Sequence, residues 1–156
     1  MTMTMRMESQ MKPSWPARVR QTYDKLGLFP FSIVQLMARF SLATIFWRSS
    51  QTKSANWDLT YQLFASEYKV PVLSPEVAAT LAYSLEHYGA ILLALGLLSR
   101  VVTLPLIGMT LVIEIFVYPL NWPDHLIWLT LLLLILTRGP GVVSLDYLAK
   151  RYFNRA

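Results

Sequence analysis

Three ionisable residues lie in the middle of apolar segments: Arg39, Glu86 and Glu114. Each shares a helical face with small or polar residues, so each is expected to point into a protein interior. A charge at bilayer depth costs about 2.5–3.5 kcal/mol even on insertion scales, which favours pairing inside the protein. Counted at about 1.5 Å per residue from the segment ends, Arg39 and Glu86 lie at similar depth. We therefore expect an Arg39–Glu86 ion pair, with Glu114 close enough to share the guanidinium.

A polar pocket is expected around this pair. His125 opens the last apolar segment, and the expected walls are Tyr83, His87, Thr110 and Tyr118. Two carboxylates facing one arginine leave one negative charge over unless a second cation or a proton completes the set. A carboxyl kept protonated in this way is a candidate proton relay or ligand acceptor. The alternative is that the buried charges only fix the register of the helices.

Several kinds of site are disfavoured. The chain has no cysteine, which excludes disulfides, iron–sulfur clusters and cysteine zinc sites within it. The only two histidines are predicted at different depths, which disfavours haem. The methionines near the start resemble a soft-metal tract, but disorder on the cytoplasmic side is the favoured interpretation (Met1, Met3, Met5, Met7 and Met11). No phosphate loop, nucleophile arrangement or zinc spacing occurs, so no catalytic motif and no metal site is predicted.

Four apolar segments must position these residues. The chain has 156 residues, of which 54% are hydrophobic and 15% charged. Soluble domains carry about a quarter charged residues, so this composition indicates a membrane protein. The segments cover about 31–47, 77–98, 101–120 and 125–137. We predict an all-α integral membrane four-helix bundle over 29–138. Because the start of the chain lacks the pattern of a signal peptide, the first span should be an uncleaved anchor.

The basic residues indicate an orientation. Only Arg48, Lys53 and Lys69 lie on the side of the first loop. The other side carries ten: Arg6, Lys12, Arg18, Arg20, Lys25, Arg100, Arg138, Lys150, Arg151 and Arg155. The positive-inside rule then puts both termini in the cytoplasm, with 1–28 a partly disordered N-terminal segment. The same distribution explains the net charge of +5 without nucleic-acid binding, because no basic stripe is interleaved with aromatics.

The connections have distinct characters. In the first loop, Trp57, Tyr61, Phe64 and Tyr68 recur at helical spacing, which predicts an amphipathic helix. That helix either lies on the outer membrane surface or caps the bundle without contacting lipid. The turn at 99–100 is tight, so the second and third segments should be antiparallel neighbours.

The final segment, 139–156, is predicted to begin with a break and then a helix. The stretch 139–141 (GPG) ends the fourth span. Ser144 should cap a new helix, with Asp146 in its first turn. Lys150, Arg151 and Arg155 give this helix a basic face, so we expect a cytoplasmic interfacial helix attracted to anionic lipid.

Several stretches also carry a family resemblance. They are the arginine-bearing first span, 46–53 (FWRSSQTK), 68–71 (YKVP), Glu86 followed by 95–100 (LGLLSR), and 139–146 (GPGVVSLD). On these stretches the chain resembles the DoxX family of small four-span bacterial membrane proteins, over about residues 31–149. Ser50 departs from the glycine often found there. The resemblance implies a four-helix membrane bundle. Some relatives are named as the quinone-linked small subunit of thiosulfate oxidation systems, and others look like accessory subunits of redox or stress complexes.

We therefore expect a bacterial inner-membrane accessory subunit of a redox or metal/sulfur stress system, with a protein partner or a second copy of itself. Its pocket, open to the outside, would hold a small anion or a quinone headgroup, with Arg39 as the cation, Glu86 as its partner and Lys53 nearby. Any enzymatic role would be that of the small subunit of a quinone-linked oxidoreductase. Two alternatives stay open: a small oligomeric transporter or proton-coupled exporter with Glu86 and Glu114 as carriers, and an assembly scaffold.

Overall fold

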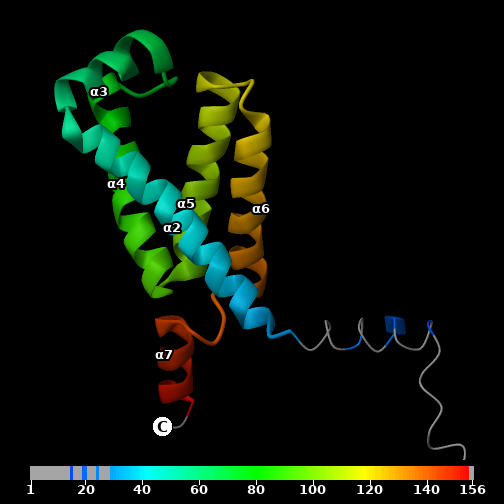
Figure 1. Cartoon of the computed structure of the whole chain (residues 1–156). Helices are drawn as coiled ribbons and strands as arrows, with labels where there is room; N and C mark the ends of the chain where they lie inside the picture. The colour runs from blue at the N-terminus through cyan, green and yellow to red at the C-terminus, as the bar shows by residue number, and fades with distance from the viewer. Residues whose placement is uncertain (1–14, 16–18, 21–23, 25–28, 155–156) are drawn as a thin grey trace, which may run out of the picture. The chain divides into compact units, whose positions relative to one another are not determined.

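Every secondary-structure element in the described part of the chain is a helix (Figure 1). The computed structural model describes residues 15, 19–20, 24 and 29–154. The elements from residue 31 onward are α2 (Phe31–Ala55), α3 (Trp57–Leu63), the π-helix η2 (Phe64–Tyr68), α4 (Pro75–Leu95), α5 (Ser99–Val112), the π-helix η3 (Ile113–Val117), α6 (Trp122–Arg138) and α7 (Leu145–Phe153). The all-α prediction is thus confirmed for these residues.

The chain divides into two units, Met1–Pro30 and Phe31–Ala156. Most of the first unit lies outside the described residues, and so do the predicted disordered segment and the methionine tract.

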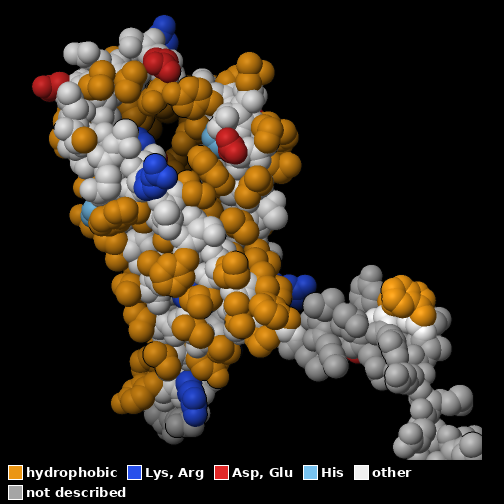
Figure 2. Space-filling view, viewed as in Figure 1, with side chains coloured by type: hydrophobic (Ala, Val, Ile, Leu, Met, Phe, Trp, Pro, Cys, Tyr) orange, Lys and Arg blue, Asp and Glu red, His pale blue; other side chains and the backbone are white. Residues whose placement is uncertain are grey.

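Two helices are long and apolar enough to cross a membrane, Pro75–Leu95 and Ser99–Val117. Hydrophobic side chains cover most of the face seen in Figure 2, as expected for a surface in contact with lipid. The α6 helix has 17 residues, and α2 carries polar residues along its length. The four-crossing bundle and its orientation stay predictions.

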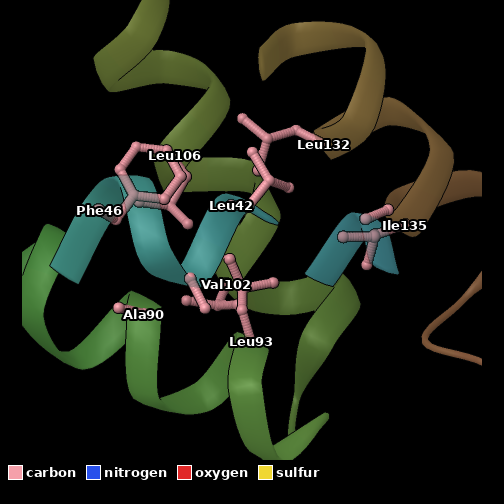
Figure 3. Close-up of a cluster of buried hydrophobic side chains, with 10 residues drawn as sticks. Leu42, Phe46, Ala90, Leu93, Val102, Leu106, Leu132 and Ile135 are labelled. Carbon is pink, nitrogen blue, oxygen red and sulfur yellow. The ribbon is translucent and has the colours of Figure 1, made fainter. Parts of the chain in front are cut away.

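One hydrophobic core joins four helices (Figure 3). The α2 helix packs against α4 and α6, and α5 packs against the same two helices. Small residues allow the close approach: a Cβ on Gly89 would lie 3.2 Å from a methyl carbon of Leu106. The buried core residues are Ala38, Leu42, Ala43, Phe46, Ala90, Leu93, Val102, Leu106, Leu132 and Ile135.

The helix predicted in the first loop is present as α3 and η2. Asn56 caps it by accepting a hydrogen bond from the Leu59 amide. Phe64 is buried against Ala78 and Ala79 of α4. The aromatic face of α3 and η2 therefore packs on the bundle. This arrangement fits a helix that caps the bundle better than a helix that lies among the lipid headgroups.

The α2 helix is longer than predicted. The apolar segment ends near residue 47, but the helix continues to Ala55. The extra turns contain mostly serine, threonine and glutamine, which hydropathy assigns to a loop. They stay helical because one face packs onto α4: Ser50 is fully buried and Lys53 contacts Glu86.

Candidate functional site

A cavity of about 530 Å³ lies between the last turns of α2, the start of α4 and the facing ends of α5, η3 and α6. Figure 2 shows the molecule hollowed there, with a histidine at the rim. Most of the lining is apolar or aromatic, as is usual for small-molecule sites. The polar lining residues are Ser49, Lys53, Tyr68, Glu86, Tyr118, Asn121 and His125.

Lys53 and Glu86 form the first charged pair of the cavity. The Lys53 Nζ donates to both carboxylate oxygens of Glu86, at 2.8 Å each. Ser49, one turn earlier on α2, donates to Oε1 of Glu86 at 3.0 Å, and Lys53 also donates to the Ser49 hydroxyl. Glu86 is only 2% exposed, so this bonding compensates for its removal from water.

Glu114 and His125 form the second pair. Nδ1 of His125 lies 2.5 Å from Oε2 of Glu114, and both side chains are buried. The His125 ring also packs edge-on to Trp128, with centroids 4.9 Å apart. His125 and Trp128 line the cavity, and Glu114 supports His125 from behind it. With Nδ1 engaged by Glu114, Nε2 is the ring nitrogen available to a ligand.

Glu114 belongs to a π-helical turn. The Tyr118 amide donates to the Ile113 carbonyl at 2.8 Å, which closes the wider turn. The other π-helix, η2, contributes Phe64 and Tyr68 to the same cavity, and the Tyr68 and Tyr118 rings meet edge-on with centroids 5.6 Å apart. Such turns recur at functional sites, and hydrophobic periodicity gives no signal for them.

The predicted Arg39–Glu86 ion pair is wrong. Arg39 is buried and donates to the Val143 carbonyl at 2.6 Å. Its guanidinium lies against Gly96, where an added Cβ would be 1.6 Å from an arginine nitrogen. Gly96 is about 15 Å along α4 from Glu86. The hydrophobic core lies between, including Leu42, Ala90 and Leu93.

The ion pair was wrongly predicted because α2 extends further than its apolar segment. Measured from the observed helix ends, Arg39 lies about 24 Å along α2 and Glu86 about 16 Å along α4. Depth counting places the two residues level only if the first helix ends near residue 47, whereas α2 continues to Ala55. The extra turns of α2 bring Lys53 to Glu86 instead. Glu114 likewise pairs with His125 and does not share the arginine.

The remaining predicted pocket residues lie in three places. Tyr118 lines the cavity and donates to Glu67 at 3.3 Å. His87 stacks with Trp47 and Tyr83, with centroids 4.9 and 5.3 Å apart, and these three residues do not line it. Thr110 is buried and donates to the Leu106 carbonyl within α5. Of the predicted set, Lys53, Glu86, Tyr118 and His125 line the cavity.

Sequence reasoning missed other lining residues. Ser49 had a usable signal, because it precedes Lys53 by one helical turn and so shares its face. For Tyr68, Asn121 and Trp128 the sequence carries no such signal, because their positions in the cavity wall depend on how the loops and α6 pack against the other helices.

A second polar assembly holds the far ends of the helices together. The Asp146 carboxylate accepts hydrogen bonds from the backbone amides of Leu98 and Ser99, at 2.8 and 2.9 Å. The Asp146 amide donates to the Gly96 carbonyl at 2.9 Å. Gln35 donates to the carbonyls of Arg138 and Gly139. The two stretches 95–100 and 139–146, quoted above for the resemblance, therefore meet here.

Ser144 performs its predicted role in this assembly. Its hydroxyl accepts from the Tyr147 amide and caps α7. Asp146 lies in the first turn of α7, as predicted. Its carboxylate also accepts hydrogen bonds from the turn between α4 and α5, which the prediction did not include.

Comparisons with known proteins bear on this arrangement. The DoxX family model matches residues 34–119, more than half of the chain. No curated protein and no solved structure matches. The matched region contains Lys53, Glu86 and Glu114, and it ends before His125 and the 139–146 stretch. On this match the chain belongs to the DoxX family of membrane proteins.

Proposed function

We propose that this protein is an inner-membrane subunit of a redox system and that its cavity binds a quinone headgroup. The observation that carries the proposal is the composition of the cavity: about 530 Å³, mostly apolar, with Lys53 and His125 in its wall. A quinone headgroup is flat and apolar, and its carbonyl oxygens accept hydrogen bonds. An ammonium group and a ring nitrogen set in aromatic walls suit those oxygens and that flat ring.

The charges favour a neutral ligand over an anion. Lys53 is already paired with Glu86, and His125 with Glu114. Arg39, the cation that the sequence suggested for an anion, is bound elsewhere. An anion entering the cavity would have to displace a carboxylate from its partner, whereas a neutral quinone can accept a hydrogen bond from Lys53 in place of the Ser49 hydroxyl and leave both ion pairs intact.

The two pairs also suit proton exchange. A bound quinone takes up two electrons and two protons on reduction. Lys53 and His125 lie in the cavity wall, each paired with a carboxylate, so each pair offers a route for a proton to a bound ring. The chain has no cysteine and therefore neither a thiol pair nor an iron–sulfur cluster of its own. The electron donor in this proposal belongs to a partner protein.

Tryptophan fluorescence tests the proposal, because Trp128 lines the cavity. Purified protein in mild detergent is titrated with short-chain ubiquinone and menaquinone analogues, and saturable quenching is expected. Lys53→Met and His125→Phe should each weaken binding about tenfold, as expected for the loss of one hydrogen bond to a charged group. Arg48→Met, on the exposed side of α2, is the matched control and should bind like the parent protein.

The result also separates the alternatives. Quenching that does not saturate, or that is equal in all variants, would reject the quinone site. Proton or solute flux in proteoliposomes that depends on Glu114 would then favour a transporter. A stable protein partner with neither property would favour a scaffold.

A further inference from the structure

A second groove, at the end of the molecule where α7 lies, has the chemistry of an anion site. It has a volume of about 530 Å³ and lies between the first turns of α2, the start of α5, the loop after α6 and the start of α7. Three cationic side chains line it: Arg100, Arg138 and Lys150. This groove is separate from the cavity that contains Lys53 and His125.

The groove has a surplus of positive charge. Its single lining carboxylate, Asp146, accepts hydrogen bonds from the Leu98 and Ser99 amides. Within the part of the chain that the structure describes, none of the three cations forms an ion pair. Three positive charges therefore line a space whose one carboxylate already accepts two hydrogen bonds.

One of the cations is held in position. The Arg100 guanidinium donates to the Thr137 carbonyl at 3.3 Å. It lies over Gly139, where an added Cβ would be 3.3 Å from its terminal nitrogen. This contact restricts an otherwise exposed side chain, whose planar guanidinium can match a phosphate with two parallel hydrogen bonds.

The surroundings suit a lipid. The groove adjoins the turn between α4 and α5, the two helices that are long and apolar enough to cross a membrane. The groove therefore lies at the end of the apolar parts of α4 and α5, the level at which lipid headgroups are expected. Leu98, Val101 and Val142 line the groove and are at least half exposed, so an acyl chain can lie beside the cationic residues.

We propose that this groove binds the headgroup of an anionic phospholipid, with Arg100 on the phosphate and Arg138 and Lys150 beside it. The occupant would be a bilayer lipid of negative net charge, and the assignment does not depend on what the other cavity holds. Bound lipid would tie α7 to the ends of α5 and α6.

The test measures lipid binding by native mass spectrometry of delipidated protein, with phosphatidylglycerol compared against phosphatidylcholine. The parent protein should prefer phosphatidylglycerol by roughly a hundredfold, since each basic residue near an anionic lipid contributes about fivefold. The triple variant Arg100→Gln, Arg138→Gln, Lys150→Gln should lose this preference. A control variant that removes two cations outside the groove, Arg48→Gln, Lys69→Gln, should keep it.

Two further measurements keep the result interpretable. Arg100→Lys retains the charge but removes the fork, and should bind phosphatidylglycerol more weakly than the parent without loss of folding, checked by size-exclusion chromatography. Inorganic phosphate should not displace the lipid; displacement by millimolar phosphate would identify a free-anion site and overturn the lipid assignment. Equal binding of both lipids by the parent, or equal loss of the preference in the triple variant and in the control variant, would also overturn it.

Discussion

Lys53 and Glu86 form a two-oxygen ion pair across α2 and α4, with both distances at 2.8 Å. The Lys53 side chain is 17% exposed and that of Glu86 only 3%. Lys53→Met should therefore leave the buried Glu86 carboxylate without its cation. We expect the free energy of unfolding to fall by about 2 kcal/mol, between the values for exposed and for fully buried ion pairs. In a chain of this size that lowers the melting temperature in detergent by roughly 4–8 °C.

The double variant Lys53→Met, Glu86→Leu is the control. Because it removes both charges and restores apolar packing, most of the lost stability should return. If the double variant melts as low as Lys53→Met, the loss comes from packing of the lysine stem and not from an uncompensated carboxylate.

Gly96 offers a sharper test of packing. It ends α4 with φ +67°, and the Arg39 guanidinium occupies the place of its missing side chain. Gly96→Ala should cost at least the left-handed penalty of about 1–2 kcal/mol, with the displacement of Arg39 in addition. Gly108→Ala is the matched control, because its Cβ would meet nothing within 4 Å.

The two glycine variants should shift the melting temperature in opposite directions. Alanine at Gly108 lies inside a helix, where it should gain about 0.5–1 kcal/mol. A parent-like melting temperature for Gly96→Ala would mean that Arg39 does not occupy the space beside Gly96.

Which faces are buried could be predicted from sequence. Glu86, Gly89 and Leu93 follow one helical stripe, and all three are buried. Ser144 has the type and position of an N-cap and acts as one. These features depend on local periodicity and on single residues, so one chain is enough to reveal them.

The partners of the buried charges could not be predicted in the same way. Pairing between helices depends on where each helix ends and how the helices cross. The polar residues after Trp47 resemble a loop by hydropathy, yet their packing on α4 keeps them helical and carries Lys53 to Glu86. The wider turn of η3 places Glu114 against His125, and no spacing rule reports a π-helix.

Asp146 is predicted to hold α7 in place. Asp146→Ala removes a charged acceptor from two backbone amides, and hydrogen bonds to charged groups are worth about 1.5–3 kcal/mol. The local result should be release of α7, detected as faster trypsin cleavage after Lys150 and Arg151. Asp58→Ala, at an exposed position in the first turn of α3, should leave that cleavage rate unchanged. Equal rates in the Asp146→Ala variant and the parent would show that other contacts hold the helix.

Variants of Arg39 and Lys53 should distinguish an effect on stability from an effect on ligand affinity. Arg39 does not line the cavity, and its side chain is bonded to the loop before α7 through Val143. Arg39→Met should therefore lower the melting temperature, with a loss of about 2 kcal/mol for a hydrogen bond from a charged donor. Its affinity for the quinone analogue, measured by tryptophan quenching, should stay that of the parent.

Lys53→Met should show the loss of affinity that Arg39→Met lacks, because only Lys53 lies in the cavity wall. A stability loss is shared by both variants, so stability alone cannot account for a difference in binding between them. The opposite pattern, with affinity lost in Arg39→Met and kept in Lys53→Met, would place the arginine at the ligand. It would return the site to the Arg39–Glu86 arrangement that depth counting alone suggests.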